Sequence, residues 1–146
     1  MDHTANLAQH LKSLDLPADA QEWLMDVWGV CQLIDDAADG DEIGPARAYE
    51  AAWSVFVRLH TNTFWDRAKS VLLPVLALQV LKWRASDEAE RDGAADERSF
   101  VWRAGFYDLV LSVCQLCGIP NAGRSVLAMY GETFEDYRGE FPCPTP

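Results

Sequence analysis

Four aspartates that lie close together in the sequence could bind a divalent cation. Asp35, Asp36, Asp39 and Asp41 belong to the segment IDDAADGD, and with Glu42 they place five acidic residues in eight positions. This segment follows an apolar, helix-like stretch, and the C-terminus of a helix carries partial negative charge. Clustered carboxylates are therefore disfavoured at this point unless a metal ion, a nearby arginine or exposure to water compensates them.

The helical spacing of these aspartates is compatible with a metal site. Asp35 and Asp39 are one turn apart on one helix face, with Asp36 beside them. Carboxylate oxygens suit hard cations such as Mg²⁺ or Mn²⁺, which keep several waters when bound. Asp35, Asp36 and Asp39 resemble the D-D-x-x-D motif of class I isoprenoid synthases, in which the motif binds magnesium and the metal holds a diphosphate. The resemblance covers five residues, and the second metal motif of those enzymes has no match here.

An EF-hand does not explain the same run. With Gly40 as the loop glycine, the twelfth position of the loop is Ala46. The bidentate glutamate that this position requires is therefore missing.

A second acidic group lies near the C-terminus, in the segment YGETFEDYRGE. Glu132 and Glu135 form E-x-x-E, and Asp136 follows. The spacing resembles that of helical nucleotide pyrophosphohydrolases of the MazG and all-alpha dUTPase kinds, whose carboxylates from two helices bind magnesium. Those enzymes use E-x-x-E with a later E-x-x-D, whereas the order is reversed here. The alternative is a solvated, charged helix face.

Arg103, Tyr107 and Asp108 stand out in the otherwise apolar segment FVWRAGFYDLV. A buried arginine is costly unless it is paired. We therefore expect Arg103 to pair with Asp35, Asp36 or Asp108. The functional alternative is that Arg103 holds a phosphate beside a metal on the aspartates. No catalytic residue can be assigned from the sequence.

The hydrophobic periodicity predicts an all-α fold, a bundle of five or six helices in a single domain over residues 1–140. Gly40, the Gly44–Pro45 pair and Gly118 give the start and stop signals. The expected helices cover about 5–14, 17–38, 45–59, 67–90, 97–117 and 122–137. Pro74 is expected to kink the fourth helix or to set its start. The proline-rich tail 141–146 is not expected to be helical.

Two of the expected helices carry a clear apolar stripe. In the second helix we expect a buried stripe at Leu24, Trp28, Cys31, Ile34 and Ala38. In the third helix the apolar stripe is composed of Ala46, Tyr49, Trp53, Phe56 and Val57.

Composition restricts the possible partners. The 146 residues have a formal net charge of −11, with 23 acidic and 12 basic residues. This argues against direct nucleic-acid binding, which needs a basic surface, and against attraction to anionic membrane. No apolar run reaches the roughly 18 residues of a membrane-spanning helix. The N-terminus MDHTANLAQH lacks the basic and apolar regions of a signal peptide.

The four cysteines are Cys31, Cys114, Cys117 and Cys143. Without a secretion signal, reduced thiols are the default. Cys114 and Cys117 form C-x-x-C inside an apolar helical segment, which favours packing. A zinc site would need two further ligands, and no second pair is available.

A longer resemblance covers residues 23–118. The chain resembles a group of uncharacterised proteins from tailed bacteriophages, which share a Q-x-x-D-D-x-x-D-G-D segment, an N-P-F-Y-like connector, and an arginine followed by Y-D. The matching segments here are EWLMDVWGVCQLIDDAADGDEI, NTFWDR, LLPVLALQVLKW and FVWRAGFYDLVLSVCQLCG. Asn62-Thr63-Phe64-Trp65 replaces the N-P-F-Y form. The resemblance implies a phage origin, an all-helical fold, and a place in the host cytoplasm or the virion, but no reaction.

Two hypotheses for function follow. One is a phage accessory or virion protein that acts through contact with a host or virion protein, for which an acidic chain suits a basic partner. The other is a small Mg²⁺- or Mn²⁺-dependent hydrolase, or a binder of phosphorylated, nucleotide-like ligands, built on Asp35, Asp36 and Asp39. If the two acidic groups converged on one cavity, the metal hypothesis would be favoured. We favour protein contact, because short phage proteins of this kind mostly lack a complete catalytic set.

Overall fold

The computed structural model describes residues 3–143, and every regular element within this range is a helix. The predicted all-helical class is therefore confirmed, with no strand among the described residues. Helical segments are more numerous than the five or six expected, because two of the expected helices are interrupted. The chain divides into two compact units, one ending at Ser70 and the other beginning at Val71. The single domain over residues 1–140 stays a prediction.

The first unit begins with α1 (His3–Ser13) and α2 (Ala18–Asp39). Pro17 precedes α2, and Gly40 ends it in the left-handed conformation, with a φ of 82°. Trp23 is buried and stacks on Trp65 with 5.5 Å between ring centroids. The buried residues of α2 all lie in its first half: Ala20, Trp23, Leu24 and Val27.

The expected buried stripe of α2 is therefore wrong beyond its first member. Leu24 is buried, but Ile34 is 48% exposed. Ala38 is exposed, while Trp28 and Cys31 are half-buried. The N-terminal half of α2 supplies core contacts, and its C-terminal half carries the acidic run into solvent.

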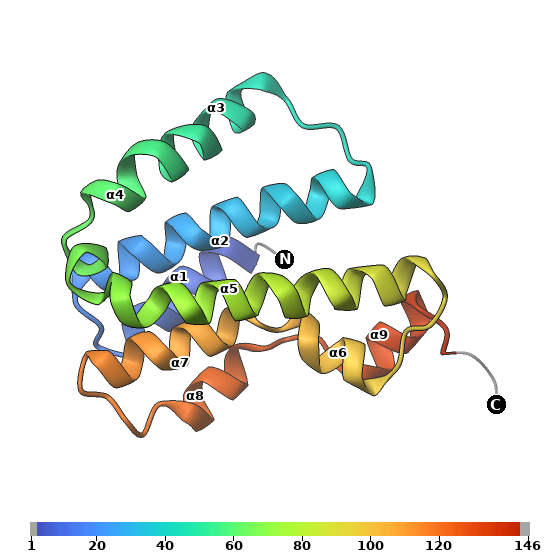
Figure 1. Ribbon diagram of the computed structural model, residues 1–146. Coiled ribbons are helices and arrows are strands. Elements are labelled where there is room, and N and C mark those ends of the chain that lie inside the picture. Colours follow the sequence, from blue (N-terminus) through green and yellow to red (C-terminus); the bar gives the residue numbers. More distant parts are fainter. Residues whose placement is uncertain (1–2, 144–146) are drawn as a thin grey trace. The chain divides into compact units, whose positions relative to one another are not determined.

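A second helical run in this unit passes through α3 (Pro45–Trp53), the π-helical segment η1 (Ser54–Arg58) and α4 (Leu59–Thr61). Pro45 occupies the first turn of α3, where its missing N–H costs nothing. Figure 1 shows this run beside α2 and antiparallel to it, joined to α2 by the loop after Gly40. Asn62 ends the run: its side chain donates to the Asp19 carbonyl at 2.8 Å and accepts from the Trp65 amide at 2.9 Å.

Helix α5 (Thr63–Arg91) continues from the first unit into the second. It begins four residues before the expected start at Arg67, because Asn62 caps it. Pro74 lies inside the helix and does not end it. Within the second unit, the deeply buried residues of α5 follow a seven-residue spacing, at Leu72, Gln79 and Ser86.

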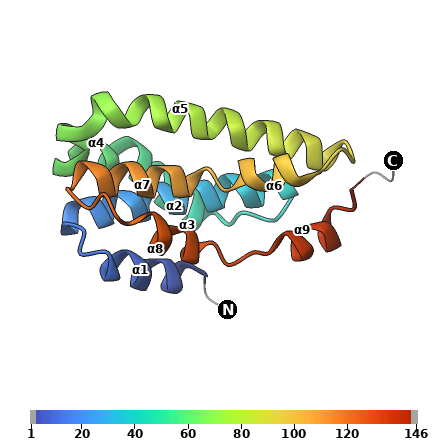
Figure 2. The ribbon, with the colours of Figure 1, turned by 90° about the horizontal axis from the view of Figure 1, so that it is seen from below.

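The second unit contains α6 (Glu97–Arg103), α7 (Phe106–Leu116), α8 (Gly123–Met129) and α9 (Phe134–Glu140). Helices α6 and α7 run back along α5, and Figure 2 shows α6 beside its C-terminal part, where the Ser86 hydroxyl donates to the Ser99 carbonyl. The expected helix 97–117 is interrupted at Ala104 and Gly105. A Cβ atom on Gly105 would lie 2.9 Å from Cγ of Gln79, so this close approach of α5 requires glycine.

The expected helix 122–137 is also divided. Tyr130 leaves α8 with an extended backbone, and Thr133 starts α9 through a capping box with Asp136. The core of this unit is apolar and is formed mainly by α7 and α8, at Phe106, Leu109, Val110, Val113, Cys114, Val126 and Met129. Helix α9 ends at Glu140, and residues 144–146 of the expected tail lie outside the described part of the chain.

Candidate functional site

One aspartate of the acidic run at the end of α2 is paired with an arginine. Asp36 forms an ion pair with Arg47 of α3. Asp35 is half-buried, and Asp39 is exposed. Among residues 3–143, no group of three or more histidine, cysteine, aspartate or glutamate side chains is arranged to hold a metal ion. The metal site at Asp35, Asp36 and Asp39 therefore stays a prediction. For Asp36, the charge is compensated by an arginine, which was one of the three possibilities considered beside a metal ion and exposure to water.

A polar pocket in the first unit was not identified from the sequence. It has a volume of about 330 Å³ and lies between α2 and the α3–η1 run, with Thr4 of α1 at its edge. Its charged lining consists of Asp26 from α2, Arg47 and Glu50 from α3, and Arg58 from η1. Opposite charges are thus brought together across two antiparallel helices.

Arg58 connects the acidic groups of this pocket. Its Nε donates to Asp26 at 2.9 Å, and its Nη2 donates to Glu50 at 2.7 Å. Ser54, which is buried, donates from Oγ to the same Asp26 carboxylate at 3.2 Å and also contacts Arg58. The pKa of Arg58 is raised, chiefly by its hydrogen bond to Glu50.

The π-helical segment places these groups. Ser54 and Arg58 are the first and last residues of η1, and both reach Asp26. A π segment inserts one residue into a helix and turns the side chains after it, and such segments are frequent at functional sites. The spacing of Glu50, Ser54 and Arg58 was visible in the sequence, but their common partner on α2 was not.

The apolar side of the same run faces away from α2. No residue of α3 is buried. Tyr49 is 77% exposed, Trp53 55% and Phe56 75%. These three residues, spaced four and three apart, form the aromatic face. The helix therefore packs with its polar side inward and its aromatic side outward, the reverse of ordinary amphipathic packing.

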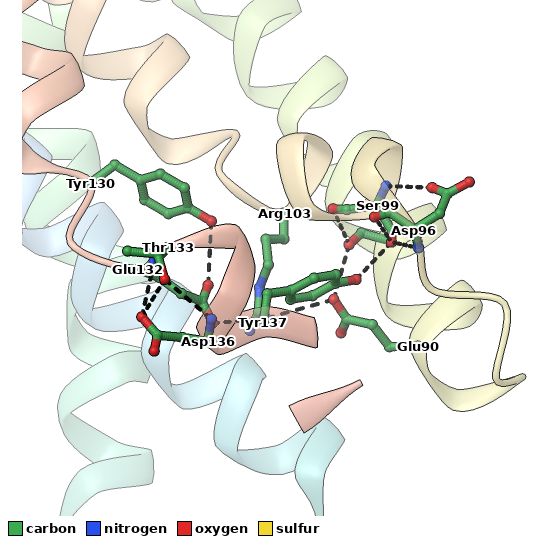
Figure 3. A network of polar contacts seen from close by, with 10 residues as sticks. Glu90, Asp96, Ser99, Arg103, Tyr130, Glu132, Thr133, Asp136 and Tyr137 are labelled. Atoms are coloured by element: carbon green, nitrogen blue, oxygen red, sulfur yellow. Dashed lines mark hydrogen bonds and ion pairs between the residues drawn. The ribbon is translucent and has the colours of Figure 1, made fainter. Parts of the chain in front are cut away.

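A second charged network lies in the other unit, around Arg103, and is shown in Figure 3. Nη1 of Arg103 is 3.5 Å from Glu132 and 3.8 Å from Glu90. The guanidinium also lies over two aromatic rings, 5.2 Å from the centroid of Tyr137 and 5.5 Å from that of Phe141. Arg103 is thus compensated by carboxylates, as its position in an apolar segment requires, but the sequence did not identify these two.

Tyrosine and serine hydroxyls complete this network. The Tyr137 hydroxyl is 2.6 Å from Oγ of Ser99, and Ser86 donates to the Ser99 carbonyl at 2.8 Å. Burial raises the pKa of Tyr137 to about 12. Burial also raises the pKa of Glu90, against the opposing attraction of Arg103. The groups contact one another and are surrounded by aromatic rings, which is the arrangement of a structural network rather than of an open catalytic centre.

The remaining predicted site residues have local partners. Asp108 pairs with Lys82 at 2.7 Å, and the Tyr107 hydroxyl donates to the Met129 carbonyl at 3.4 Å. Asp136 closes the capping box of α9 with Thr133, while Glu135 is exposed. Of the second acidic group, Glu132 alone is drawn in beside Arg103. The sequence Thr133-Phe134-Glu135-Asp136 carried the capping signal that explains Asp136.

The four cysteines form no disulfide in the described part of the chain: Cys31, Cys114, Cys117 and Cys143 are all thiols. Cys114 is buried in the core of its unit, as the packing interpretation predicted.

Comparison of the chain with protein-family models, with curated proteins and with solved structures gives no match. Within residues 3–143, no helix combines the length and the apolar character that a membrane span needs.

Proposed function

We propose that this protein acts by binding another protein through the aromatic face of α3 and η1. The single observation that carries the proposal is the inverted packing of this run. Ser54 and Arg58 contact Asp26 of α2. On the other side of the run, Tyr49, Trp53 and Phe56 are exposed. Aromatic side chains are the residue types enriched at the centres of protein interfaces.

The charge around the aromatic face defines the partner. Residues 35–61 contain six acidic side chains and two arginines. Both arginines are engaged, Arg47 with Asp36, and Arg58 with Asp26 and Glu50. The exposed Asp39, Asp41 and Glu42 lie just before α3. A partner with a basic rim around an apolar centre suits this surface, because charge complementarity speeds encounter and excludes partners of like charge.

The resemblance to tailed-phage proteins narrows the biological setting. On that basis the protein is an accessory or virion component, present in the host cytoplasm or the virion, and its partner is a host or virion protein. A basic surface of that kind is typical of proteins that themselves bind nucleic acid.

A titration with a defined peptide tests the chemistry of this surface. The probe is a helical peptide composed of leucine and lysine with one apolar face, and the control peptide replaces lysine with glutamate. We expect the wild-type protein to bind the basic peptide, with the peptide's apolar side on the aromatic face. The variant Tyr49→Ser, Trp53→Ser, Phe56→Ser keeps the net charge and should bind at least about tenfold more weakly, since each anchor residue contributes roughly 1 kcal/mol or more.

The control variant is Leu127→Ser, whose side chain is 73% exposed on α8. It should bind the basic peptide as the wild type does. Equal binding of the wild type and the triple serine variant would contradict the proposal, because attraction between opposite charges alone would then explain the binding.

The metal hypothesis has its own test. If Asp35, Asp36 and Asp39 bind Mg²⁺ or Mn²⁺, millimolar metal raises the Tm by mass action. The variant Asp35→Asn, Asp39→Asn should abolish that rise. A Tm indifferent to metal, together with no heat in calorimetry, leaves Asp36 with Arg47 as its sole compensation and rejects a metal-dependent hydrolase.

A further inference from the structure

A second apolar surface lies on α5, and it is distinct from the aromatic face. From Val71 onward the deeply buried residues of this helix are Leu72, Gln79 and Ser86, whereas Phe64 and Ala68 are buried nearer its N-terminus. The opposite side exposes large apolar residues to solvent, to between 50% and 66% of their area: Val71, Leu73, Leu78, Val80 and Leu81. From Val71 onward, α5 therefore exposes more large apolar side chains than it buries.

One line of residues along this outer side has the spacing of a coiled-coil seam. Its members are all exposed and are separated alternately by four and three residues: Asp66, Ser70, Leu73, Ala77, Val80 and Arg84. Alternating steps of four and three are the repeat that keeps one helix against another over several turns. Asp66 and Arg84 are eighteen residues, or about five turns, apart on this continuous helix, so they share one side of it. We call these six residues the outer seam.

The outer seam is complementary to itself when it is reversed. In two antiparallel copies related by a twofold axis near residue 75, Leu73 meets Ala77 of the second copy, and Ser70 meets Val80. Large residues thus face small ones in each layer. At both ends Asp66 meets Arg84 of the second copy, and the pairing occurs twice because a twofold interface repeats every contact.

The charges on and around the outer seam favour a second copy of this chain as its partner, rather than the basic protein proposed for the aromatic face. Residues 70–81 carry no charged side chain, in a chain whose net charge is −11. Lys69 and Lys82, which flank this stretch, are paired with Asp66 and Asp108, so the stretch offers a basic partner no surplus of negative charge. Two outer seams bring no surplus of acidic groups together. The ion pairs that Asp66 and Arg84 make within one copy, with Lys69 and Glu88, are exposed pairs of small energy and can be exchanged.

We infer that the protein forms a twofold-symmetric homodimer in which α5 of one copy packs antiparallel against α5 of another along the outer seam. This interface is independent of the aromatic face, so each can fail without the other.

Sedimentation equilibrium of the full chain tests the dimer. The wild type should sediment as a dimer at micromolar concentrations. Ala77→Glu places two carboxylates in the apolar centre of the interface and should raise the dimer dissociation constant at least about a hundredfold. Leu127→Glu, on the exposed side of α8, adds the same charge outside the interface and should leave the dimer intact.

A charge swap tests the register. Asp66→Arg and Arg84→Asp each set like charges against one another at both ends, and each should weaken the dimer about tenfold. The double variant restores opposite charges and should return the dissociation constant to within about threefold of the wild type. Circular dichroism and Tm verify that every variant is folded, which is expected because the substituted side chains are exposed.

Three outcomes would overturn the inference. If the wild type stays monomeric at high concentration, the protein does not form the dimer. A dissociation constant unchanged by Ala77→Glu places the dimer elsewhere on the surface. If the double variant has as high a dissociation constant as the single variants, the antiparallel register is wrong.

Discussion

Two arginines in this protein each bridge a pair of carboxylates, and the two sites differ in their surroundings. Arg58 joins Asp26 and Glu50 across the polar pocket, and its side chain is 39% exposed. Arg103 lies between Glu90 and Glu132, its side chain is 24% exposed, and its guanidinium lies over two aromatic rings. The first network holds α3 and η1 against α2 and leaves the aromatic face exposed to solvent. In the second network, aromatic rings pack against the arginine itself.

The difference shows what a charge network does in each unit. Around Arg103, aromatic burial and ion pairing stabilise the same structure, so the network is part of the core. Around Arg58, polar contacts replace the apolar contacts that α3 could have made with α2. The apolar side of α3 is thereby kept available, which is the physical basis for assigning it to a partner.

Removal of Arg103 should have the largest effect on stability. Arg103→Ala leaves Glu90, whose side chain is 9% exposed, without its cation and removes two contacts with aromatic rings. We expect a loss of about 2 to 4 kcal/mol in the free energy of unfolding. Urea denaturation measures it, and a loss below about 1 kcal/mol would mean that the network does not belong to the core.

Removal of Arg58 should cost less. Arg58→Met keeps the aliphatic stem and loses the ion pairs, one of which is with the 65% exposed Glu50. We expect a loss of about 1 kcal/mol or less. If urea denaturation gave equal losses for Arg58→Met and Arg103→Met, the contrast between the two sites would be wrong.

Removal of the Tyr137 hydroxyl measures how much one hydrogen bond of the Arg103 network contributes to stability. Tyr137→Phe keeps the buried ring and removes the 2.6 Å hydrogen bond with Ser99. The expected loss is about 1 kcal/mol, the ordinary net value of such a bond. Thermal unfolding measures it, and Tyr107→Phe, which removes a 3.4 Å bond, should cost less.

Glu90 should make stability depend on pH. Burial raises the pKa of Glu90 in the folded protein above the ordinary value of 4.5, so the folded state binds this proton more tightly than the unfolded state does. Its contribution is fully present below pH 4.5 and is lost as the pH rises through the raised pKa. The stability of the wild type minus that of Glu90→Gln should therefore decrease from pH 4 towards neutrality. Parallel stability curves would show that burial does not shift this pKa.

The helices could largely be located from sequence, because their signals are local. Gly40 and Pro45 ended and began helices as their conformations require. The division at Gly105 was not predictable, because it depends on the approach of Gln79 from a different helix. The division before Thr133 was predictable in principle, because Thr133 and Asp136 have the spacing of a capping box.

The packing of the helices could not be predicted to the same degree. Periodicity indicates which residues share a helix side, but it does not indicate which side meets a neighbour. Tyr49, Trp53 and Phe56 share a side as expected, yet the polar residues of their helix pack on α2. For Arg103 the sequence indicated a need for carboxylates, but Glu90 and Glu132 are distant in the chain and reach it only through the fold.

Photo-crosslinking from the aromatic face tests the central claim most directly. Benzoylphenylalanine in place of Phe56, which is 75% exposed, is compared with the same residue in place of Leu127, which is 73% exposed. Both variants are illuminated in the cells that naturally make the protein, and the products are identified by mass spectrometry. We predict one dominant adduct from position 56, to a protein with a basic surface, and none of that adduct from position 127. No adduct from position 56, or the same adducts from both positions, would contradict the account.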